Sequence, residues 1–312
     1  MIEMWDDLFC ARDPAVRAAL DCGDGLRAFN LMHCDLDRAW LEIGRVLIDG
    51  GWVCVNVGDA TRTIDGRFRL YPNHARVISA CTSLGFDILP AVVWRKQTNA
   101  PNKFMGSGML PAGAYVTLEH EYILLMRKGA KREFSAADKK RLRRQSAYFW
   151  EERNRWFSDI WDFKGTRQDL STSGSRERSA AFPFELPYRL INMSSIQGDT
   201  VLDPFVGTGV TTLAAMASGR DSIGVDVDDH LLRDALAKAC AAAPFLDKLL
   251  KERSASHTRF VEEYTRDKGT LSHRNRPHGF PVMTAQEEEM QLDSIDRMQP
   301  CGDDSLCVTY RS

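Results

Sequence analysis

A glycine-rich stretch that begins with an acid is the part of the sequence best suited to hold a small-molecule ligand. It reads Asp203-Pro-Phe-Val-Gly-Thr-Gly209, and a second acid, Asp226, follows further along the chain. Glycine allows the backbone to approach a ligand closely. An acid placed after the following strand can accept hydrogen bonds from both hydroxyls of a ribose. The pattern therefore predicts a nucleoside-binding site.

Three kinds of nucleoside cofactor can be compared with this loop. A dinucleotide-binding loop requires a third glycine where the chain has Thr212, which also disfavours a nicotinamide oxidoreductase. A phosphate-binding P-loop requires a lysine that is absent here. Asp203 would repel a pyrophosphate, but it suits the sulfonium and ammonium cations of S-adenosylmethionine. We therefore expect S-adenosylmethionine, with a glycine turn of some other α/β enzyme as the alternative.

The residues around the loop predict the elements that position it. Val201 and Leu202 form an apolar run typical of a buried parallel strand, and Val210–Ala217 is rich in small residues that let a helix pack closely on a sheet. Ser222–Val225 predicts a second strand that ends at Asp226. This is a βαβ unit, and ligands of open α/β sheets bind at the carboxyl edge of such strands.

The same residues resemble the cofactor motif of the DNA amino-methyltransferases, which methylate cytosine N4 or adenine N6. The resemblance implies a Rossmann-like α/β sheet in a circularly permuted order, with the catalytic half before the cofactor half. Phe182-Pro183 resembles the second cofactor element of the family, although a helix start with proline in its first turn is the alternative reading. The residues implied to contact the cofactor are Asp203, Pro204, Phe205, Gly207, Thr208, Gly209, Asp226, Phe182 and Pro183.

The tetrapeptide that positions the target amine in this family is not in the sequence. Family members have Asp, Asn or Ser, then two prolines and an aromatic residue; the first groups accept hydrogen bonds from the amine and the ring stacks on the flipped base. No two prolines are adjacent in this chain, and Met1–Asp6 resembles the segment that follows the tetrapeptide. We therefore expect a truncated chain that lacks one core strand at its N-terminus and is inactive as written. The alternative is a pseudoenzyme that binds cofactor or DNA without catalysis.

The first part of the chain alternates predicted helices and strands, as in half of a doubly wound sheet. Helical spacing over residues 36–47 predicts a helix with Asp35 as its N-cap and Gly50-Gly51 as its stop; residues 77–84 predict another. Strands are expected at residues 52–57, 86–94 and 121–126. Asp59 follows the first of these strands, either as a functional acid or as its terminator, and His120 is expected to be structural. Trp94-Arg-Lys96 with Asn99 and Pro101, and Glu119–Leu125, resemble later blocks of the family.

A basic run followed by aromatic residues occupies the middle of the chain. A charge run is usually a solvated helix face, but in a DNA-modifying protein it favours phosphate contacts. Family members have their target-recognition segment in this interval. The cations expected to contact DNA are Lys139, Lys140, Arg141, Arg143 and Arg144, and the aromatic residues that follow are Tyr148, Phe149, Trp150, Trp156 and Trp161.

Composition sets broader limits. The formal net charge is −2, so DNA contact requires a local basic surface. Eight cysteines without a Cys-x-x-Cys pair argue against a metal site and favour a reducing cytoplasm. We find no signal peptide and no apolar run long enough to cross a membrane. An alanine-rich helix is expected at residues 230–243, ended by Pro244.

These observations predict four segments and one function. Residues 1–128 are expected to form the catalytic-side half, 129–178 the target-recognition segment, 179–264 the S-adenosylmethionine-binding half and 265–312 a polar extension. The expected function is site-specific methylation of double-stranded DNA, with cytosine N4 favoured over adenine N6. A cognate restriction endonuclease is a further expected partner.

Overall fold

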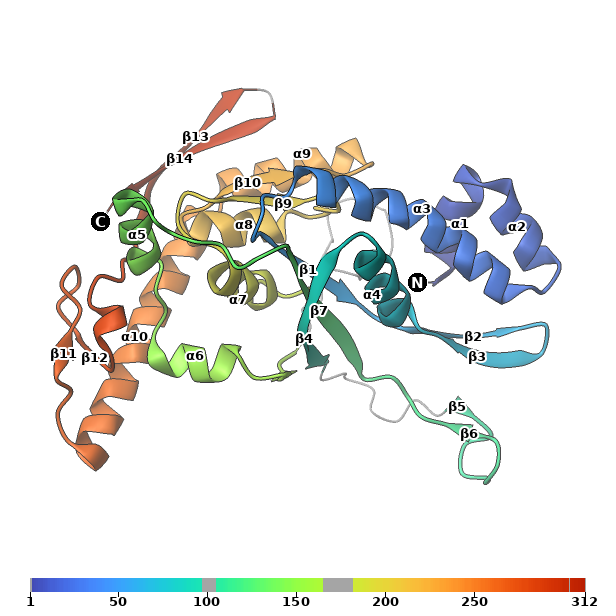
Figure 1. The fold of residues 1–312 in the computed structure, drawn as a ribbon, viewed down its shortest axis with the longest axis horizontal. Coiled ribbons are helices and arrows are strands. Elements are labelled where there is room, and N and C mark those ends of the chain that lie inside the picture. Colours follow the sequence, from blue (N-terminus) through green and yellow to red (C-terminus); the bar gives the residue numbers. More distant parts are fainter. Residues whose placement is uncertain (1, 97–104, 165–181, 303, 312) are drawn as a thin grey trace. The chain divides into compact units, whose positions relative to one another are not determined.

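The computed structural model describes residues 2–96, 105–164, 182–302 and 304–311 (Figure 1). The described residues up to Arg132, together with Asp159–Lys164, belong to one compact unit. Glu133–Ser158 and all described residues from Phe182 onward belong to a second unit. Each unit combines helices with strands, which confirms the predicted α/β class. The circular permutation and the missing N-terminal strand remain predictions.

The first unit begins with three helices and continues into a small mixed sheet with two hairpins (Figure 1). Its elements are α1 (Ile2–Arg12), α2 (Pro14–Asp21), α3 (Gly25–Val46), β1 (Trp52–Val57), β2 (Ala60–Ile64), β3 (Arg67–Tyr71), α4 (Asn73–Ser83), β4 (Phe86–Arg95), β5 (Met105–Gly106), β6 (Ala114–Tyr115), β7 (His120–Lys128) and β8 (Ile160–Asp162).

The sheet of the first unit has the strand order β1-β7-β4-β8. β7 is antiparallel to both β1 and β4, whereas β4 and β8 are parallel. The predicted alternation of helices and strands is present, and β1 and β4 run in the same direction, but the reversed direction of β7 between them was not predicted. Ile123, Leu124 and Met126 of β7 are buried because the strand is central, and such an apolar run gives no information about strand direction.

Helix α3 is longer than predicted. It begins at Gly25, where Asp24 caps it by accepting a hydrogen bond from the Arg27 amide (3.0 Å). Asp35, the predicted N-cap, lies inside the helix and forms an ion pair with Arg12 (2.8 Å). The helix ends at Val46, before the glycines expected to stop it. The prediction for Asp35 was wrong because a capping residue type inside a helix can be satisfied by an ion pair.

The second unit contains the predicted βαβ unit. β9 (Thr200–Asp203), α8 (Val210–Ala217) and β10 (Asp221–Gly224) lie close to their predicted positions, and the two strands are parallel with Leu202 opposite Ile223. The other elements are α5 (Ala137–Gln145), α6 (Trp150–Trp156), α7 (Glu185–Ser194), α9 (Asp229–Cys240), α10 (Ala243–Lys268), β11 (His273–Arg274), β12 (Pro281–Val282), the 3-10 helix η1 (Ala285–Glu287), β13 (Ser294–Gly302) and β14 (Ser305–Arg311).

Pro244 begins a helix instead of ending one. α9 stops at Cys240, and Pro244 lies in the first turn of α10, where its missing N–H leaves no helical hydrogen bond unmade. The predicted boundary at residue 264 falls inside α10. The roles given to the four sequence segments remain predictions.

The core of the second unit contains aromatic residues that follow the basic run. Phe149 and Trp156 are almost fully buried. Beside them, Arg253 donates two hydrogen bonds of 2.7 Å to Glu152 and one of 3.0 Å to the Tyr188 hydroxyl. Trp161 is likewise buried, in the first unit. These rings therefore pack in cores, and of the five aromatics only Trp150 is exposed.

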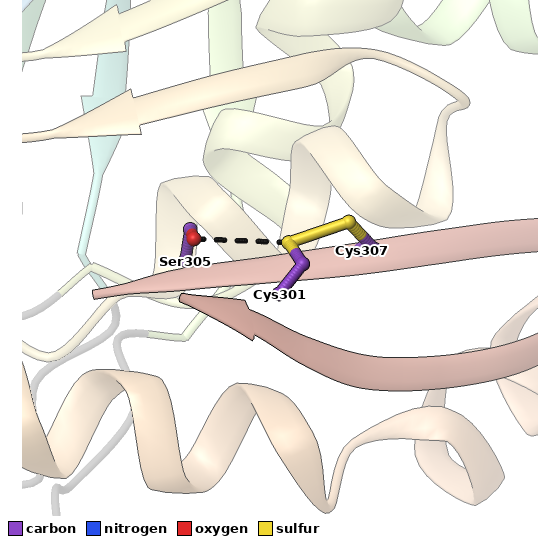
Figure 2. Close-up of a disulfide and its surroundings, with 3 residues drawn as sticks. All are labelled: Cys301, Ser305 and Cys307. Atoms are coloured by element: carbon purple, nitrogen blue, oxygen red, sulfur yellow. Dashed lines mark hydrogen bonds between the residues drawn. A yellow bond between two sulfur atoms is a disulfide. The ribbon is translucent and has the colours of Figure 1, made fainter. Parts of the chain in front are cut away.

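A disulfide joins Cys301 and Cys307 across the β13–β14 hairpin (Figure 2). Gly302 lies opposite Ser305 in the antiparallel register, so the turn brings the two cysteines to a Cα–Cα distance of 5.7 Å. Cys301 Sγ also lies 3.7 Å from Ser305 Oγ (Figure 2). The cysteine spacing favoured a reducing compartment and gave no sign of this bond, because only the pairing of β13 with β14 brings the two cysteines together.

Candidate cofactor-binding site

The loop between β9 and α8 is fixed by hydrogen bonds at both of its ends. Asp203 Oδ1 accepts a hydrogen bond from the Phe205 amide (3.0 Å), which closes the first turn. The Val206 amide donates to the Val225 carbonyl (3.0 Å), and the Val225 amide donates to the Asp203 carbonyl (2.9 Å). The loop is therefore attached to the chain that leaves β10.

The two glycines of the loop are required for different reasons. Both adopt left-handed backbone conformations, with φ of +51° at Gly207 and +80° at Gly209. A Cβ added at Gly207 would meet no atom closer than the Phe205 carbonyl oxygen at 3.9 Å, so the space beside this residue is open. A Cβ at Gly209 would lie 3.0 Å from the Cβ of Ala235 on α9. Gly207 thus leaves room for a ligand, whereas Gly209 permits close packing of α9.

Asp226 connects the end of the second strand to the glycine loop. Its Oδ2 accepts a hydrogen bond from the Gly207 amide (2.9 Å), and its Oδ1 accepts one from the Asp228 amide (3.0 Å). A carboxylate has about four acceptor positions, so each oxygen keeps capacity for a further donor. The sequence predicted a ligand-binding role for Asp226 and missed this bracing role.

Large apolar side chains near the loop are exposed to solvent. Phe205 is 51% exposed, Val225 49% and Val227 84%. Apolar surface beside a few oriented polar groups is typical of a small-molecule site. The open space at Gly207, the carboxylate of Asp226 and this apolar surface fit the ribose and adenine of S-adenosylmethionine. Pro204 and Thr208 belong to the same loop and are partly buried.

Phe182 and Pro183 lead into α7. The Pro183 carbonyl accepts a hydrogen bond from the Leu186 amide (3.0 Å), so these residues form the approach to the helix. Ile191 of α7 packs with Ala214 and Ala215 of α8 in one core cluster. The pair therefore precedes a helix that packs against the helix after the glycine loop, while its contact with cofactor remains a prediction.

The five predicted DNA-contacting cations are exposed on α5. Arg144 forms an ion pair with Glu289 (3.4 Å), and the guanidinium of Arg143 lies over the Phe134 ring (4.9 Å to its centroid). Within the described part of the chain, we find no ion pair for Lys139, Lys140 or Arg141. These three cations are therefore the ones best able to contact phosphates.

Two acids of the first unit lie in polar networks at the ends of β1 and β7. Both oxygens of Asp59 are within 2.8 Å of His74 Nδ1, and one also accepts a hydrogen bond from the His74 amide. Glu121 is ion-paired with Lys96 and accepts a hydrogen bond from Asn56 Nδ2 (2.7 Å). The structure thus shows a structural partner for Asp59 and brings Lys96 and Glu121 together, which the sequence did not predict.

His120, Asn99 and Pro101 are the remaining residues singled out in the sequence. The ring of His120 meets the edge of Tyr122 at 5.0 Å between centroids. Asn99, Pro101 and the segment before Phe182 lie outside the described residues. Among the residues described, no group of three or more His, Cys, Asp or Glu is arranged for a metal, and no helix is long and apolar enough to cross a membrane.

Comparisons with known proteins identify the family of the chain. Residues 24–238 match the model of the DNA methylase family N6_N4_Mtase. The matched range includes the sheet of the first unit, the glycine loop and Asp226. The chain therefore belongs to this family of S-adenosylmethionine-dependent DNA methyltransferases.

Individual relatives extend the comparison. The chain is 48% identical to the Type II methyltransferase M.MthZI of Methanothermobacter thermautotrophicus, over 94% of this chain and 81% of the relative. It is 47% identical to the Type II methyltransferase M.MjaI of Methanocaldococcus jannaschii, over 74% of this chain and 78% of that protein. Among solved structures, it is similar to TTHA0409, described as a DNA modification methylase of Thermus thermophilus, in complex with S-adenosyl-L-methionine. That match has 32% identity and a TM-score of 0.58, and it covers 70% of this chain and 81% of the other.

Proposed function

We propose that this chain is a site-specific methyltransferase by family, for an exocyclic amino group of double-stranded DNA with cytosine N4 favoured over adenine N6, and that it is inactive as written. The observation that carries the proposal is the glycine loop after β9, which is held by the carboxylate at the end of the adjacent parallel strand. The Type II names of its relatives support a partner restriction endonuclease, and a cytoplasmic location accords with that role. The overall resemblance to the family favours cytosine N4.

The proposed cofactor contacts divide by chemistry. The remaining lone pairs of Asp226 accept the ribose hydroxyls, Asp203 attracts the cationic methionine part, and Phe205 covers the adenine. Pro204, Gly207, Thr208 and Gly209 form the backbone wall of the site, and Phe182 and Pro183 approach from α7. S-adenosylmethionine supplies an electrophilic methyl group there.

We propose one role for each of the four predicted segments. Residues 1–128 form the catalytic side, 129–178 recognise the target, 179–264 hold the cofactor and 265–312 extend this half. Within the second segment, the exposed cations of α5 contact the phosphates. These contacts position the duplex, whereas base contacts specify the site.

Transfer requires groups that orient the amine. The sequence contains no adjacent prolines, and therefore no acceptor-Pro-Pro-aromatic loop. We expect the chain alone to bind cofactor without transferring methyl groups. An added N-terminal segment made of an apolar strand followed by Ser-Pro-Pro-Tyr should confer transfer, because its side chain and carbonyl accept the amine hydrogens and its ring stacks on the flipped base.

The test compares the chain with and without this extension. Tritiated methyl incorporation into mixed-sequence duplex DNA measures transfer, and mass spectrometry of the digested DNA distinguishes N4-methylcytosine from N6-methyladenine. An extension with Ala-Ala in place of Pro-Pro is the matched control. Robust incorporation by the unextended chain would show that other residues orient the amine. Cofactor binding without transfer in every version would favour a binding protein.

A further inference from the structure

A hairpin in the first unit exposes large apolar side chains at its tip. β5 and β6 pair at Met105–Tyr115 and Gly106–Ala114, and the turn between them contains Met109 and Leu110. Met109 is 90% exposed, Leu110 70% and, just beyond β6, Val116 86%. A single exposed apolar residue needs no explanation, but such a group within one short segment is typical of an interaction site.

The tip is held in a defined turn. The Ser107 amide donates to the Gly113 carbonyl (2.9 Å), and the Ser107 hydroxyl donates to the Leu110 carbonyl (2.8 Å). Ala112 adopts a positive φ of +67°, which residues with a Cβ rarely do. The turn therefore presents the apolar side chains to solvent in a fixed arrangement, which reduces the ordering entropy lost on binding.

An aromatic contact attaches this hairpin to a second one. The ring of Tyr115 stacks on the ring of Phe68 in β3, with centroids 4.1 Å apart and planes within 16° of parallel. Figure 1 shows β2–β3 and β5–β6 as two hairpins of the first unit. The stack fixes the base of the apolar tip on the β2–β3 hairpin.

The hairpin that contacts the base of the tip is mainly positive in charge. The β2–β3 hairpin contains Arg62, Arg67 and Arg69 and one acid, Asp65, and no acid occurs between Lys96 and Glu119. Arg62 forms an ion pair with Asp6 (2.7 Å), but we find no ion pair for Arg67 or Arg69 within the described residues. An apolar tip joined through the Tyr115–Phe68 stack to a hairpin with exposed or half-buried arginines complements a polyanion whose interior is apolar, which is the chemistry of duplex DNA.

We propose that Met109, Leu110 and Pro111 insert into the base stack of the duplex, while Arg67 and Arg69 contact its phosphates. Proteins that unstack DNA use apolar wedges of these residue types. A methyltransferase that acts on a base amine must take the base out of the stack, and a wedge fills the space that the base leaves. This inference rests on the proposed function, since it assigns a DNA contact to the same enzyme.

The test uses the full chain and two labelled duplexes in fluorescence anisotropy. One duplex is intact, and the other has the same sequence with a single abasic site, where the gap already exists. We expect the unaltered chain to bind the abasic duplex about tenfold more tightly, and M109A/L110A to lose most of this preference. The salt dependence of binding should be the same in both proteins, because no cation is removed.

Two further variants complete the design. The matched control is L41A/I48A, which truncates side chains that are 55% and 56% exposed on or after α3; it should keep the preference. M109Q/L110Q preserves side-chain length and should behave as the alanine pair does. If the tip and control variants keep the same preference for the abasic duplex, the proposal that the tip inserts into the base stack is wrong, while the proposed function still stands. Loss of self-association in M109A/L110A with unchanged DNA binding would identify a protein contact and would also overturn it. Failure of the unaltered chain to bind either duplex would contradict the proposed function as well.

Discussion

Asp226 holds the glycine loop, and we propose that the same side chain also accepts the ribose of the cofactor. Its two oxygens accept hydrogen bonds from the Gly207 and Asp228 amides. Those bonds orient the carboxylate in the free protein, so the proposed contact with a ribose would need little rearrangement. Loss of this side chain should therefore disturb the loop as well as the ligand contact.

We expect Asp226→Ala to weaken S-adenosylmethionine binding by about 2 kcal/mol, the scale of a charge-assisted hydrogen bond. Gly207→Val should abolish binding, because its side chain would enter the open space and strain a positive φ. Calorimetry measures both affinities. Asp234→Asn, on the exposed surface of α9, is the control. Unchanged affinity in both altered proteins would place the cofactor elsewhere.

His257 makes the stability of the second unit depend on pH. Burial alone lowers the pKa of His257, but hydrogen bonds to Glu151 and to the Pro281 carbonyl, each 2.8 Å, raise it above its ordinary value of 6.5. Because the folded pKa exceeds the unfolded pKa, the stabilisation is complete below about pH 6.5 and is lost as the pH rises through the folded pKa.

The expected result is a stability difference between the unaltered chain and His257→Gln that shrinks as the pH rises. Urea unfolding at a series of pH values measures it. Glu151→Gln should flatten the same dependence, because it removes the carboxylate that favours the charged ring. A difference that grows with pH would contradict this assignment.

Among the elements, helix α5 carries the exposed cations that we expect to set the salt dependence of DNA binding. Lys139, Lys140 and Arg141 are exposed, whereas Arg144 is partly neutralised by Glu289. Each phosphate contact contributes about 0.9 to the slope of log K against log salt. Replacing the three exposed cations with alanine should therefore reduce that slope by about 2 to 3.

DNA-binding titrations at several salt concentrations check this expectation. Replacing Lys248, Lys251 and Lys268 of α10 with alanine removes the same charge from another exposed surface and should change the slope less. An identical change for the two triple variants would mean that α5 acts only through net charge.

Helix α6 is joined to α10 by a buried ion pair. Both Glu152 oxygens accept from Arg253, and the side chains are 5% and 10% exposed. Arg253→Met leaves Glu152 buried without its partner, so the free energy of unfolding should fall by about 3–5 kcal/mol. Urea unfolding checks the value. Lys248→Met, which removes an exposed partner of Glu252 on the same helix, should cost less than about 1 kcal/mol.

The elements that could be predicted from the sequence are those defined by neighbouring residues. The β9–loop–α8 segment was predicted because its apolar run, its glycines and its small helical residues are adjacent. The start of α3 and the place of Pro244 in α10 are also set locally, but Asp35 and Pro244 are residue types that suit more than one place along a helix, so their pattern did not decide between them. The Arg253–Glu152 pair joins residues 101 positions apart, and no local pattern indicates it. Asp226 was predicted as a ligand acceptor because it directly follows a predicted strand. Its bond to the Gly207 amide was not predicted, because the two residues are 19 positions apart.

At the scale of the whole molecule, the segment predicted to recognise DNA is divided between the two units. α5 and α6 belong to the second unit, whereas β8 belongs to the first. Net charge and composition do not reveal such a division, because each part has its own buried aromatic residues. Phe149 and Trp156 pack in one unit, and Trp161 packs in the other.

The central position of β7 has a consequence for the order of folding. β1 and β4 are hydrogen-bonded to β7 and not to each other, and the other neighbour of β4, β8, comes later still. Among the strands that the structure describes, a growing chain that has passed β4 therefore offers neither β1 nor β4 its native neighbour until β7 emerges. Such distant pairing slows folding and leaves open strand edges that can aggregate. Pulse-labelled hydrogen exchange should show amides of β1, β4 and β7 gaining protection in one phase, after the local β2–β3 hairpin. Leu124→Pro, which removes a donor within β7, should leave all three strands unprotected together.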